Sequence, residues 1–408
     1  MEEYFQQMST RGQSHLSSEI MASLKFKIVA CCLCLLTAFV TAQGQTDKGN
    51  TDFFKKTGNL IDSLTRKKVD PLYVVRPKYP WRVIVQQRTD QSTLHMKSRY
   101  DGSNFFEGVV GDITVEPRIS TAVSTSVGTW IGYRGWGIGY SVNVAGDKGD
   151  DWNIESSSGF YYVKLRLHQF KGSEFEARLK GNLADPEDPT AKPEPFDFMQ
   201  PMYLSSPVKI KTQLLEGVYI FQHRRFSYSA AFNQSYIQKR SAGSPIAGIR
   251  LFHSDYDYTH DSNADLIFNM NDIGRINSWQ ISIGGGYAYN WVPVKNLLIN
   301  IMAMPILTVY NHIKTYSYDS NYRQMALDDV VHSDDELPRE DYRISLMGTD
   351  SRTSRITLNI NSRASVTYNW PRLYISANGN FYHSRYSYKK NSGRLDDWSV
   401  NPKVGVRF

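Results

Sequence analysis

The sequence predicts an all-β protein, a transmembrane antiparallel up-and-down β-barrel of about 12 strands with a short N-terminal periplasmic helix. Aromatic residues make up 13% of a chain whose mean hydropathy is polar, and long segments alternate apolar with polar side chains. Both features are typical of a barrel wall that is apolar outside and wet inside. A soluble β-sandwich would also alternate, but its strands are usually shorter than the roughly ten residues that cross a bilayer.

The first element is an export signal over residues 25–42, KFKIVACCLCLLTAFVTA. A short basic start, an apolar run and small residues at the end are typical of a secretory signal peptide, with cleavage after Ala42. A membrane-spanning helix would need about 20 apolar residues. Because residues 1–20 are polar and partly acidic, we interpret residues 1–42 as a misassigned start plus the signal peptide.

Cysteine usage and charge exclude several kinds of site. Cys31, Cys32 and Cys34 all lie in the signal peptide, so the mature chain carries no thiol for a disulfide or a thiolate metal site. The formal charge of +7 is spread along strand-like segments, whereas nucleic-acid binding needs Lys and Arg gathered on one element. We therefore predict no cofactor, no metal and no nucleic-acid partner.

Residues 43–80 form a predicted periplasmic N-terminal segment. Between residues 52 and 68, five apolar residues recur at roughly helical spacing before Pro71, which predicts one short amphipathic helix. An irregular tail is the alternative.

The barrel is predicted over residues 81–408. The clearest alternation runs from 355 to 368, where one face is apolar for lipid and the other polar for water. The last strand ends in Phe408 and resembles the C-terminal signal strand of bacterial outer-membrane barrels. That resemblance implies that Phe408 is an assembly signal for the barrel-assembly machinery, in a protein of the bacterial outer membrane.

The number of strands is predicted from the requirement that a bacterial barrel has an even number of them. The pattern places six strands near 81–95, 115–125, 129–144, 154–169, 174–183 and 208–222, and six more near 245–256, 279–290, 297–310, 355–368, 372–383 and the last residues. Outer loops then fall near 96–114, 145–153, 184–207, 257–276, 311–352 and 384–397. Trp291, Trp370 and Phe408 should share one aromatic girdle at the periplasmic side.

Parity also assigns the segment 223–243, which must begin and end at the periplasm and cannot be a single crossing. We predict that it folds into or under the periplasmic mouth. Its basic residues, the plug candidates Arg224, Arg225, Lys239 and Arg240, would either pair with lumen acids such as Glu174 and Glu176 or stand free to attract anions.

A family resemblance rests on three stretches: HRRFSYSAAFNQSYIQKRSAGS, the strand from Trp81, and the YNWPRLYIS hairpin. Together they resemble an uncharacterised outer-membrane family of Bacteroidetes with a domain of unknown function. The resemblance implies location and architecture only.

Inward-pointing basic residues suggest what the lumen favours. The lumen candidates are Lys164, Arg166, Arg178, Lys180, Lys209, Lys211, Arg355, Arg363, Lys403 and Arg407. A basic lumen lowers the barrier for anions, which predicts a narrow anion-leaning channel or small-solute pore with an unknown substrate. The alternative is that these charges pair across strands only to be satisfied.

Two other classes of function stay open. An outer-membrane lipase-type enzyme would need a Ser-His pair, but the eight mature histidines are scattered and no Gly-x-Ser-x-Gly motif is present, so we predict no enzyme. A structural or adhesive barrel would have a lumen sealed by side chains. Residues 261–272 have the alternating oxygen ligands of a calcium loop, but Leu266 stands in place of the turn glycine, so a solvated acidic loop explains them better. Acidic residues at 328–336 lie in the longest predicted outer loop, where divalent ions could bridge them to lipopolysaccharide phosphates; a hydrated loop is the alternative.

Overall fold

The computed structural model describes residues 69–101, 109–146, 149–184, 192–257, 273–317, 348–353, 356–388 and 391–408. The predicted signal peptide, the helix over 52–68 and the acidic segments 261–272 and 328–336 lie outside these residues. Within the described part of the chain, no helix is both long and apolar enough to cross a membrane.

The described elements are almost all strands. In chain order they are β1 (Val74–Val75), β2 (Trp81–Asp101), β3 (Val109–Ser120), β4 (Ser124–Tyr133), β5 (Trp136–Ala145), β6 (Asp150–Ser157), β7 (Tyr161–Leu183), β8 (Glu194–Ile220), the helix α3 (Tyr228–Phe232), β9 (Ile237–Gln238), β10 (Ala242–Asp257), β11 (Ile273–Trp291), β12 (Leu297–Ser317), β13 (Gly348–Thr353), β14 (Thr357–Asn369), β15 (Leu373–Tyr388) and β16 (Asn391–Arg407).

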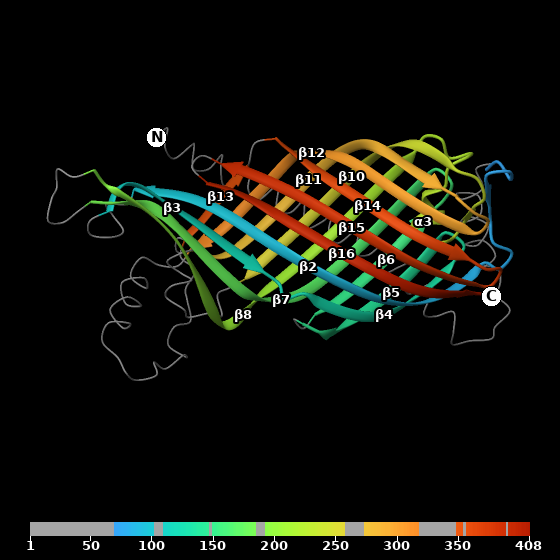
Figure 1. Cartoon of the computed structure of the whole chain (residues 1–408), viewed down its shortest axis with the longest axis horizontal. Coiled ribbons are helices and arrows are strands. Elements are labelled where there is room, and N and C mark those ends of the chain that lie inside the picture. The colour runs from blue at the N-terminus through green and yellow to red at the C-terminus, as the bar shows by residue number, and fades with distance from the viewer. Residues whose placement is uncertain are drawn as a thin grey trace, which may run out of the picture. The chain divides into compact units, whose positions relative to one another are not determined.

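Twelve strands close into an antiparallel barrel, which confirms the predicted fold (Figure 1). Around the barrel the order is β2, β4, β5, β6, β7, β8, β10, β11, β12, β14, β15 and β16, and β16 pairs with β2. One end carries tight turns at 134–135, 158–160, 292–296 and 370–372 together with the segment 221–241, and the other end carries connections that include the long ones at 258–272 and 318–347. Because short turns are periplasmic in such barrels, we call these the periplasmic end and the outer end.

The barrel wall changes between its two ends. β3 and β4 form one descending path, interrupted at 121–123, and both pair with β2. The short hairpin β5–β6 fills the wall near the periplasmic end, and beyond it β3 pairs directly with β7. Toward the outer end the wall therefore loses the two strands of this hairpin.

Several predicted strand limits are wrong, although six strands do precede residue 223. The predicted strand 129–144 contains the turn at Arg134 and Gly135, and the predicted strand 154–169 contains the bend at 158–160. The predicted break between 169 and 174 lies inside β7. A two-residue turn leaves no gap between the two alternating runs and only inverts their phase, so that odd positions such as Val127 and Ile131 are exposed before it and even positions such as Tyr140 and Val142 after it.

Trp130 lies on the inner face of β4 and is nearly fully buried. A Cβ atom at Gly132 or Gly137 would fall within the space of its ring, and one at Gly139 would lie 2.7 Å from its Cδ1 atom. The indole therefore packs directly against glycines of β4 and β5, which leave room for it because they have no side chain.

We expect Gly137→Ala to destabilise the barrel by about 1–3 kcal/mol, because the added methyl must displace the Trp130 ring from a packed wall. Gly379→Ala is the matched control, since nothing lies within 4 Å of a Cβ built at Gly379. Urea unfolding of the two variants in lipid vesicles measures the difference. Equal unfolding midpoints would show that the space beside Trp130 at Gly137 does not affect stability.

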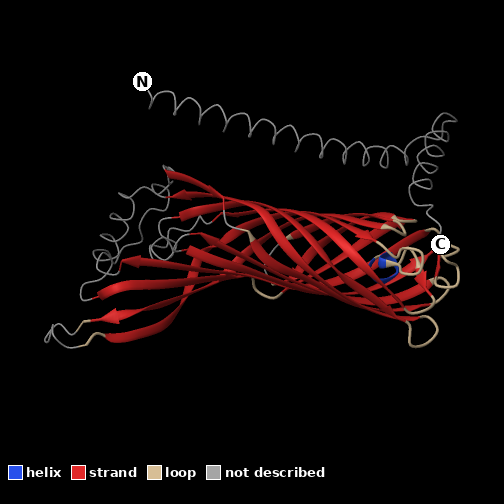
Figure 2. Cartoon of the chain, turned by 90° about the horizontal axis from the view of Figure 1, so that it is seen from above, coloured by secondary structure: helices blue, strands red, loops and turns tan. Residues whose placement is uncertain are grey.

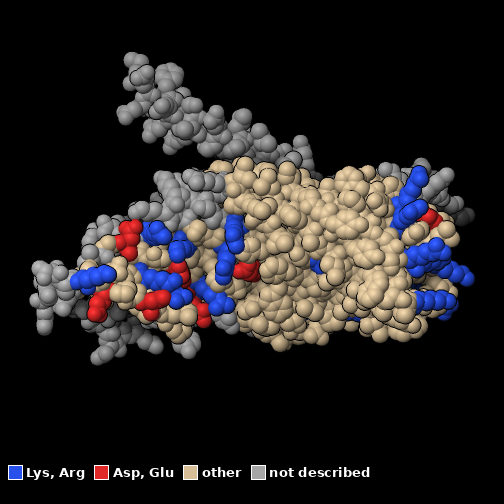
Figure 3. All heavy atoms as spheres, turned by 45° about the horizontal axis from the view of Figure 1, so that its top comes forward, with Lys and Arg blue, Asp and Glu red and all other residues tan. Residues whose placement is uncertain are grey.

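Side chains near the middle of the barrel alternate between membrane and lumen. In β14, Leu358 and Val366 are exposed on the outer surface, while Asn359, Asn361 and Thr367 are buried inside. Figure 3 shows the resulting wide band with almost no charge, between two charged ends. Trp291, Trp370 and Phe408 are all exposed at the periplasmic end, as predicted for a shared girdle.

Near the outer end the two faces exchange character. The register of β7 against β8 shifts between Gly172 and Glu174, after which Phe175 and Leu179 are buried in a cluster with the inward-facing Leu94 of β2. The charged neighbour Arg178 lies outside, where it forms a bidentate ion pair with Asp197 at 2.7 Å. Apolar side chains therefore fill part of the lumen beyond the membrane band.

Candidate functional site

Residues 221–241, between β8 and β10, do not cross the wall. After turns at 221–225 the chain enters the barrel, forms α3, and leaves through β9, which pairs with β1. Figure 2 shows the helix within the barrel at its periplasmic end. We call residues 226–238 the plug segment, because all side chains from 226 to 236 are buried there.

Local sequence explains why the plug segment is helical at its centre. Ser227 is the N-cap, and its hydroxyl accepts a hydrogen bond from the backbone N–H of Ala230 at 3.1 Å. Ala230 and Ala231 are small enough to lie against the wall, and α3 ends at Asn233.

One side of the plug segment packs on an apolar patch of the inner wall. Phe226, Tyr228, Phe232 and Tyr236 belong to one buried cluster with wall residues of β8, β10, β11 and β12. The wall residues are Val218, Ile220, Ile246, Ala288, Leu298, Met302, Met304 and Ile306. This contact gives the segment a fixed seat inside the lumen.

Three buried cations hold the other side of the plug segment by its backbone. The Lys403 ammonium donates to the carbonyl oxygen of Phe232 at 2.5 Å, and the Arg407 guanidinium donates to that of Gln234 at 3.4 Å. Arg82 donates to the carbonyl oxygen of Asn233. Successive carbonyls at the end of α3, which a helix leaves without partners, are thus bound by β2 and β16.

A buried ion pair anchors the tyrosine of the helix. Arg363 of β14 contacts both carboxylate oxygens of Glu216 of β8 at 2.6 Å and donates to the Tyr228 hydroxyl at 3.1 Å. Glu216 has no exposed surface and the Arg363 side chain is 9% exposed. The three groups link β8 and β14, which three strands separate in the wall, through the plug segment.

The two ends of the plug segment lie close together. The Gln238 amide donates to the carbonyl oxygens of Arg225 and Arg240, at 2.6 and 2.9 Å. Its own carbonyl oxygen accepts from the backbone N–H of Ser227 and from Asn290. The segment is therefore a loop that returns to its point of entry.

Of the two alternatives for the basic plug candidates, the structure contradicts pairing with lumen acids and leaves an exposed position at the periplasmic mouth. Arg224, Arg225, Lys239 and Arg240 are all exposed on the periplasmic side. Arg225 and Arg240 lie over the Tyr73 ring, and the Lys239 ammonium donates to the carbonyl oxygen of Pro71. The proposed partners Glu174 and Glu176 belong to β7 beyond its register shift, near the outer end, where Glu176 pairs with Arg118.

The N-terminal strand β1 covers the plug segment from the periplasmic side. Val74 and Val75 pair with Gln238 and Ile237 of β9, and Val74 is fully buried against the plug cluster. The Arg76 guanidinium also donates to the Tyr236 hydroxyl at 3.0 Å. Nothing in the sequence pattern distinguishes so short a strand from an irregular linker.

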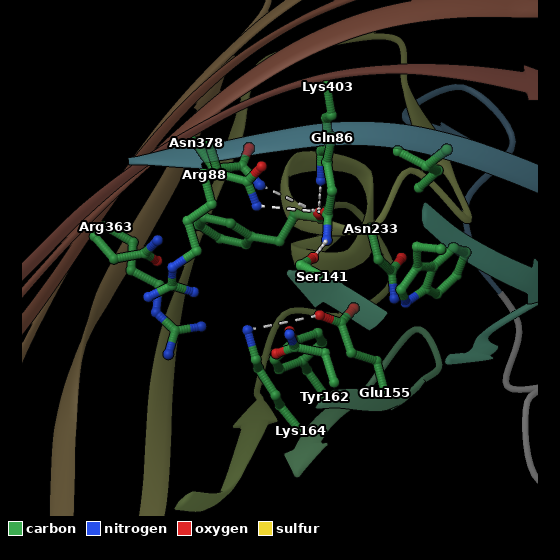
Figure 4. Close-up of a pocket in the computed structure, with 16 residues that line it drawn as sticks. Gln86, Arg88, Ser141, Glu155, Tyr162, Lys164, Asn233, Arg363, Asn378 and Lys403 are labelled. Atoms are coloured by element: carbon green, nitrogen blue, oxygen red, sulfur yellow. Dashed lines mark hydrogen bonds and ion pairs between the residues drawn. The ribbon is translucent and has the colours of Figure 1, made fainter. Parts of the chain in front are cut away.

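A polar chamber lies in the lumen beyond the plug segment (Figure 4). Its cavity volume is about 50 Å³, and it is lined by Ile84, Gln86, Arg88, Trp130, Ser141, Asn153, Glu155, Tyr162, Lys164, Phe232, Asn233, Arg363, Asn378, Asn380, Asn401 and Lys403. A water molecule needs about 10–15 Å³ of such volume, so the chamber holds a few waters or one small ion.

Most charges around the chamber are paired. Arg88 and Arg166 share Asp90 and Asp151, with Arg88 to Asp90 and Arg166 to Asp151 both at 2.7 Å. Lys164 lies 3.9 Å from Glu155, a longer contact than either of these.

Positive charge nevertheless exceeds negative charge in this part of the lumen. The inward cations that the structure describes here are Arg82, Arg88, Lys164, Arg166, Arg250, Arg363, Lys403 and Arg407, and the inward acids are Asp90, Asp151, Glu155, Glu216 and Asp397. The cations without a carboxylate partner at hydrogen-bond distance include the three that bind plug carbonyls.

The structure divides the predicted lumen residues into two groups. Lys164, Arg166, Arg363, Lys403 and Arg407 point inward around the chamber and the plug segment. Arg178, Lys180, Lys209 and Lys211 do not, which corrects their assignment, and Arg355 lies outside the described residues.

The physical reason is the exchange of faces near the outer end. There Val208 and Ile210 fill the interior, so Lys209 and Lys211 lie on the outer surface. The rule that the apolar face meets lipid holds only at the depth of the hydrocarbon.

Sequence reasoning missed Arg82, Arg88 and Asp90. All three lie on one face of β2 in the stretch WRVIVQQRTD, so the alternation of that strand could have revealed them. Glu216 stands among apolar residues of β8, and only the position of Arg363 across the lumen shows its role.

The contacts of His383 do not fit Ser-His chemistry. His383 Nδ1 contacts Asp396, and His383 Nε2 accepts a hydrogen bond from Arg385 Nε at 2.8 Å. With Nε2 occupied in this way, the ring cannot accept the proton of a serine. In the described part of the chain no group of three or more His, Cys, Asp or Glu side chains could hold a metal ion.

Solved structures similar to this chain are outer-membrane barrels. The translocator domain of the autotransporter NalP from Neisseria meningitidis is 10% identical, with a TM-score of 0.28, covering 91% of this chain and 99% of that one. The outer membrane protease OmpT from Escherichia coli is 9% identical, with a TM-score of 0.27 and coverage of 81% and 97%. An outer membrane channel from Pseudomonas putida F1 is 11% identical, with a TM-score of 0.27 and coverage of 84% and 100%.

A search of curated proteins finds no match to this chain. The family resemblance seen in the sequence is confirmed by a family model that covers the barrel and the residues just before it. Residues 68–408 match the model of the domain of unknown function DUF4421, and the chain belongs to that family.

Proposed function

We propose that this outer-membrane barrel is a gated pore for small anions, which the plug segment closes at the periplasmic mouth. One observation carries the proposal: Lys403, Arg82 and Arg407 are bound to backbone carbonyls of the plug segment rather than to carboxylates. If the segment moves out, these three cations lose their contacts with its carbonyls, and Arg82 and Arg407 keep only wall contacts, to Arg134 and to Asn369 and Trp370. Opening and anion preference would then arise from the same event.

The size of the chamber supports a small solute. A cavity of about 50 Å³ accommodates an ion of the size of a few water molecules, such as an inorganic anion or a small carboxylate. Amide side chains of Gln86, Asn153, Asn380 and Asn401 line it beside the cations and can donate hydrogen bonds to such a solute.

Export belongs to the same proposal. The signal peptide over residues 25–42 would be removed after Ala42, and the last strand would be recognised by the barrel-assembly machinery. Lipopolysaccharide and phospholipid would surround the apolar band.

A disulfide that ties the plug segment to the wall tests the gate. The hydroxyl oxygens of Ser157 in β6 and Ser235 in the plug segment are 3.4 Å apart, and the chain has no cysteine outside residues 31–34. In planar bilayers we expect the oxidised Ser157→Cys/Ser235→Cys double variant to lose its openings. Addition of reductant should restore openings with the reversal potential of an anion-preferring pore.

The single variants Ser157→Cys and Ser235→Cys are the controls, since neither can form the bond. Identical currents in oxidised and reduced protein would mean that the segment does not gate. A reversal potential that favours cations would overturn the anion preference while leaving the gate intact.

A further inference from the structure

The periplasmic end of the barrel is strongly basic. The cations described there are Arg76, Lys78, Arg134, Arg224, Arg225, Lys239, Arg240, Lys295 and Arg372, and Asp70 is the acidic side chain that the described residues add at this end. Figure 3 shows this end with mainly Lys and Arg on its surface, whereas the opposite end mixes both signs. Such an excess of one sign attracts a partner of the other.

Four of these cations form a rim set, namely Lys78, Arg134, Lys295 and Arg372, which lie in turns or in the approach to β2. Backbone hydrogen bonds join these turns into one arc. The N–H of Arg134 donates to Pro80, the carbonyl of Arg372 accepts from the N–H of Arg407, and that of Asn296 accepts from the N–H of Asn369. The rim set therefore follows neighbouring strands at the edge of the barrel.

The rim set sits beside the aromatic girdle. The Arg134 guanidinium lies 5.3 Å from the centre of the Tyr133 ring, and Tyr133 in turn contacts Trp81 with ring centres 4.8 Å apart. Arg372 lies 4.9 Å from the centre of the Tyr79 ring and donates to its hydroxyl at 3.1 Å. Lys78 lies over the same ring at 5.8 Å.

Depth in the membrane decides which anion these cations meet. Girdle aromatics lie at the level of the lipid headgroups, so cations in the adjoining turns lie at the level of the phosphates. We propose that the rim set binds the headgroups of anionic phospholipids in the periplasmic leaflet of the outer membrane. Lys78 and Arg372 at Tyr79, with Arg134 at Tyr133, form the centre of this site, and Lys295 extends it to the turn after Trp291.

The four cations of the plug candidates provide an internal comparison. Arg224, Arg225, Lys239 and Arg240 are at the same end and carry the same charge, but they lie at the entry and exit of the plug segment, with Arg225 and Arg240 over Tyr73 and the Lys239 ammonium on the carbonyl oxygen of Pro71. An acidic soluble partner would meet this second set, whereas a lipid headgroup meets the rim set.

The test compares two lipids in vesicles that contain the full-length protein. Quenching of tryptophan fluorescence by brominated phosphatidylglycerol and by brominated phosphatidylcholine gives the relative binding constant of the two lipids. A cation near an anionic headgroup contributes a factor of about five to binding. The wild type should therefore prefer phosphatidylglycerol by at least several-fold, and the rim variant Lys78→Gln/Arg134→Gln/Lys295→Gln/Arg372→Gln should bring the ratio close to one.

The matched control is Arg224→Gln/Arg225→Gln/Lys239→Gln/Arg240→Gln, which removes the same charge from the same end. It should keep the wild-type preference. If both variants lost the preference for phosphatidylglycerol equally, net charge would explain it and the proposed site would be wrong. The proposal would also be wrong if the wild type bound both lipids equally. Heat-modifiable mobility in gels confirms that each variant has folded, and the result does not depend on whether the barrel conducts.

Discussion

Removing the plug segment should raise the single-channel conductance several-fold and shift the reversal potential toward that of an anion pore. The variant deletes residues 226–239 and joins Arg225 to Arg240 through two glycines. The join is feasible because Gln238 holds the carbonyl oxygens of Arg225 and Arg240 within hydrogen-bond distance of one side chain. The deletion opens the mouth and removes the carbonyls of the plug segment that Lys403, Arg82 and Arg407 bind in the lumen.

Adding Lys403→Gln to the deletion should weaken the anion preference with little change in conductance. Lys403→Gln in the intact protein is not an equivalent control, because there the lysine holds the helix. The better control is Arg224→Gln/Arg225→Gln/Lys239→Gln/Arg240→Gln, because this variant keeps the plug segment in place. It should conduct like the wild type. A deletion variant that inserts and folds but conducts no better would show that the lumen is closed elsewhere, for example by the apolar cluster around Leu94 and Phe175.

Glu216→Gln should lower the free energy of unfolding by about 3–5 kcal/mol, because it leaves the buried Arg363 charge without its carboxylate. The substitution also weakens the contact of Arg363 with Tyr228, so the plug segment should open more often. Urea unfolding in vesicles measures the first effect, and opening frequency in planar bilayers measures the second.

The exposed pair Arg178–Asp197 is the matched control. It also joins an arginine to both oxygens of one carboxylate, here through Nε and Nη2 at 2.7 Å each, but its side chains are 46% and 47% exposed. Asp197→Asn should therefore leave the unfolding midpoint unchanged. The double variant Glu216→Gln/Arg363→Met should recover part of the stability, because neither charge is then buried alone. No recovery would show that the loss has another cause.

The sequence alone determined the class of fold, the number of strands and the fate of residues 223–243. Alternation with a period of two is a local property, and it marks β14 and β16 without any knowledge of their neighbours. Parity then follows from chain continuity, because a strand that leaves the periplasm must be followed by one that returns. Both inferences depend on the order of residues and on the thickness of a bilayer.

Only the tertiary structure decided what the inward charges do. Lys403 and Arg407 meet carbonyls of Phe232 and Gln234, more than 170 residues away in the chain, and Arg363 meets Glu216 across the lumen. Alternation shows on which face a side chain lies, but the closure of the barrel determines what lies opposite.

The outer end was misjudged for a related reason. The register shift in β7 after Gly172 moves each later side chain to the other face of the wall. The sequence pattern also does not indicate at which residue a strand leaves the lipid. Beyond that depth the lumen holds Val208 and Ile210, while Lys209 and Lys211 lie outside. The direction of the hydrophobic face thus depends on what surrounds the wall at each level, which only the assembled barrel defines.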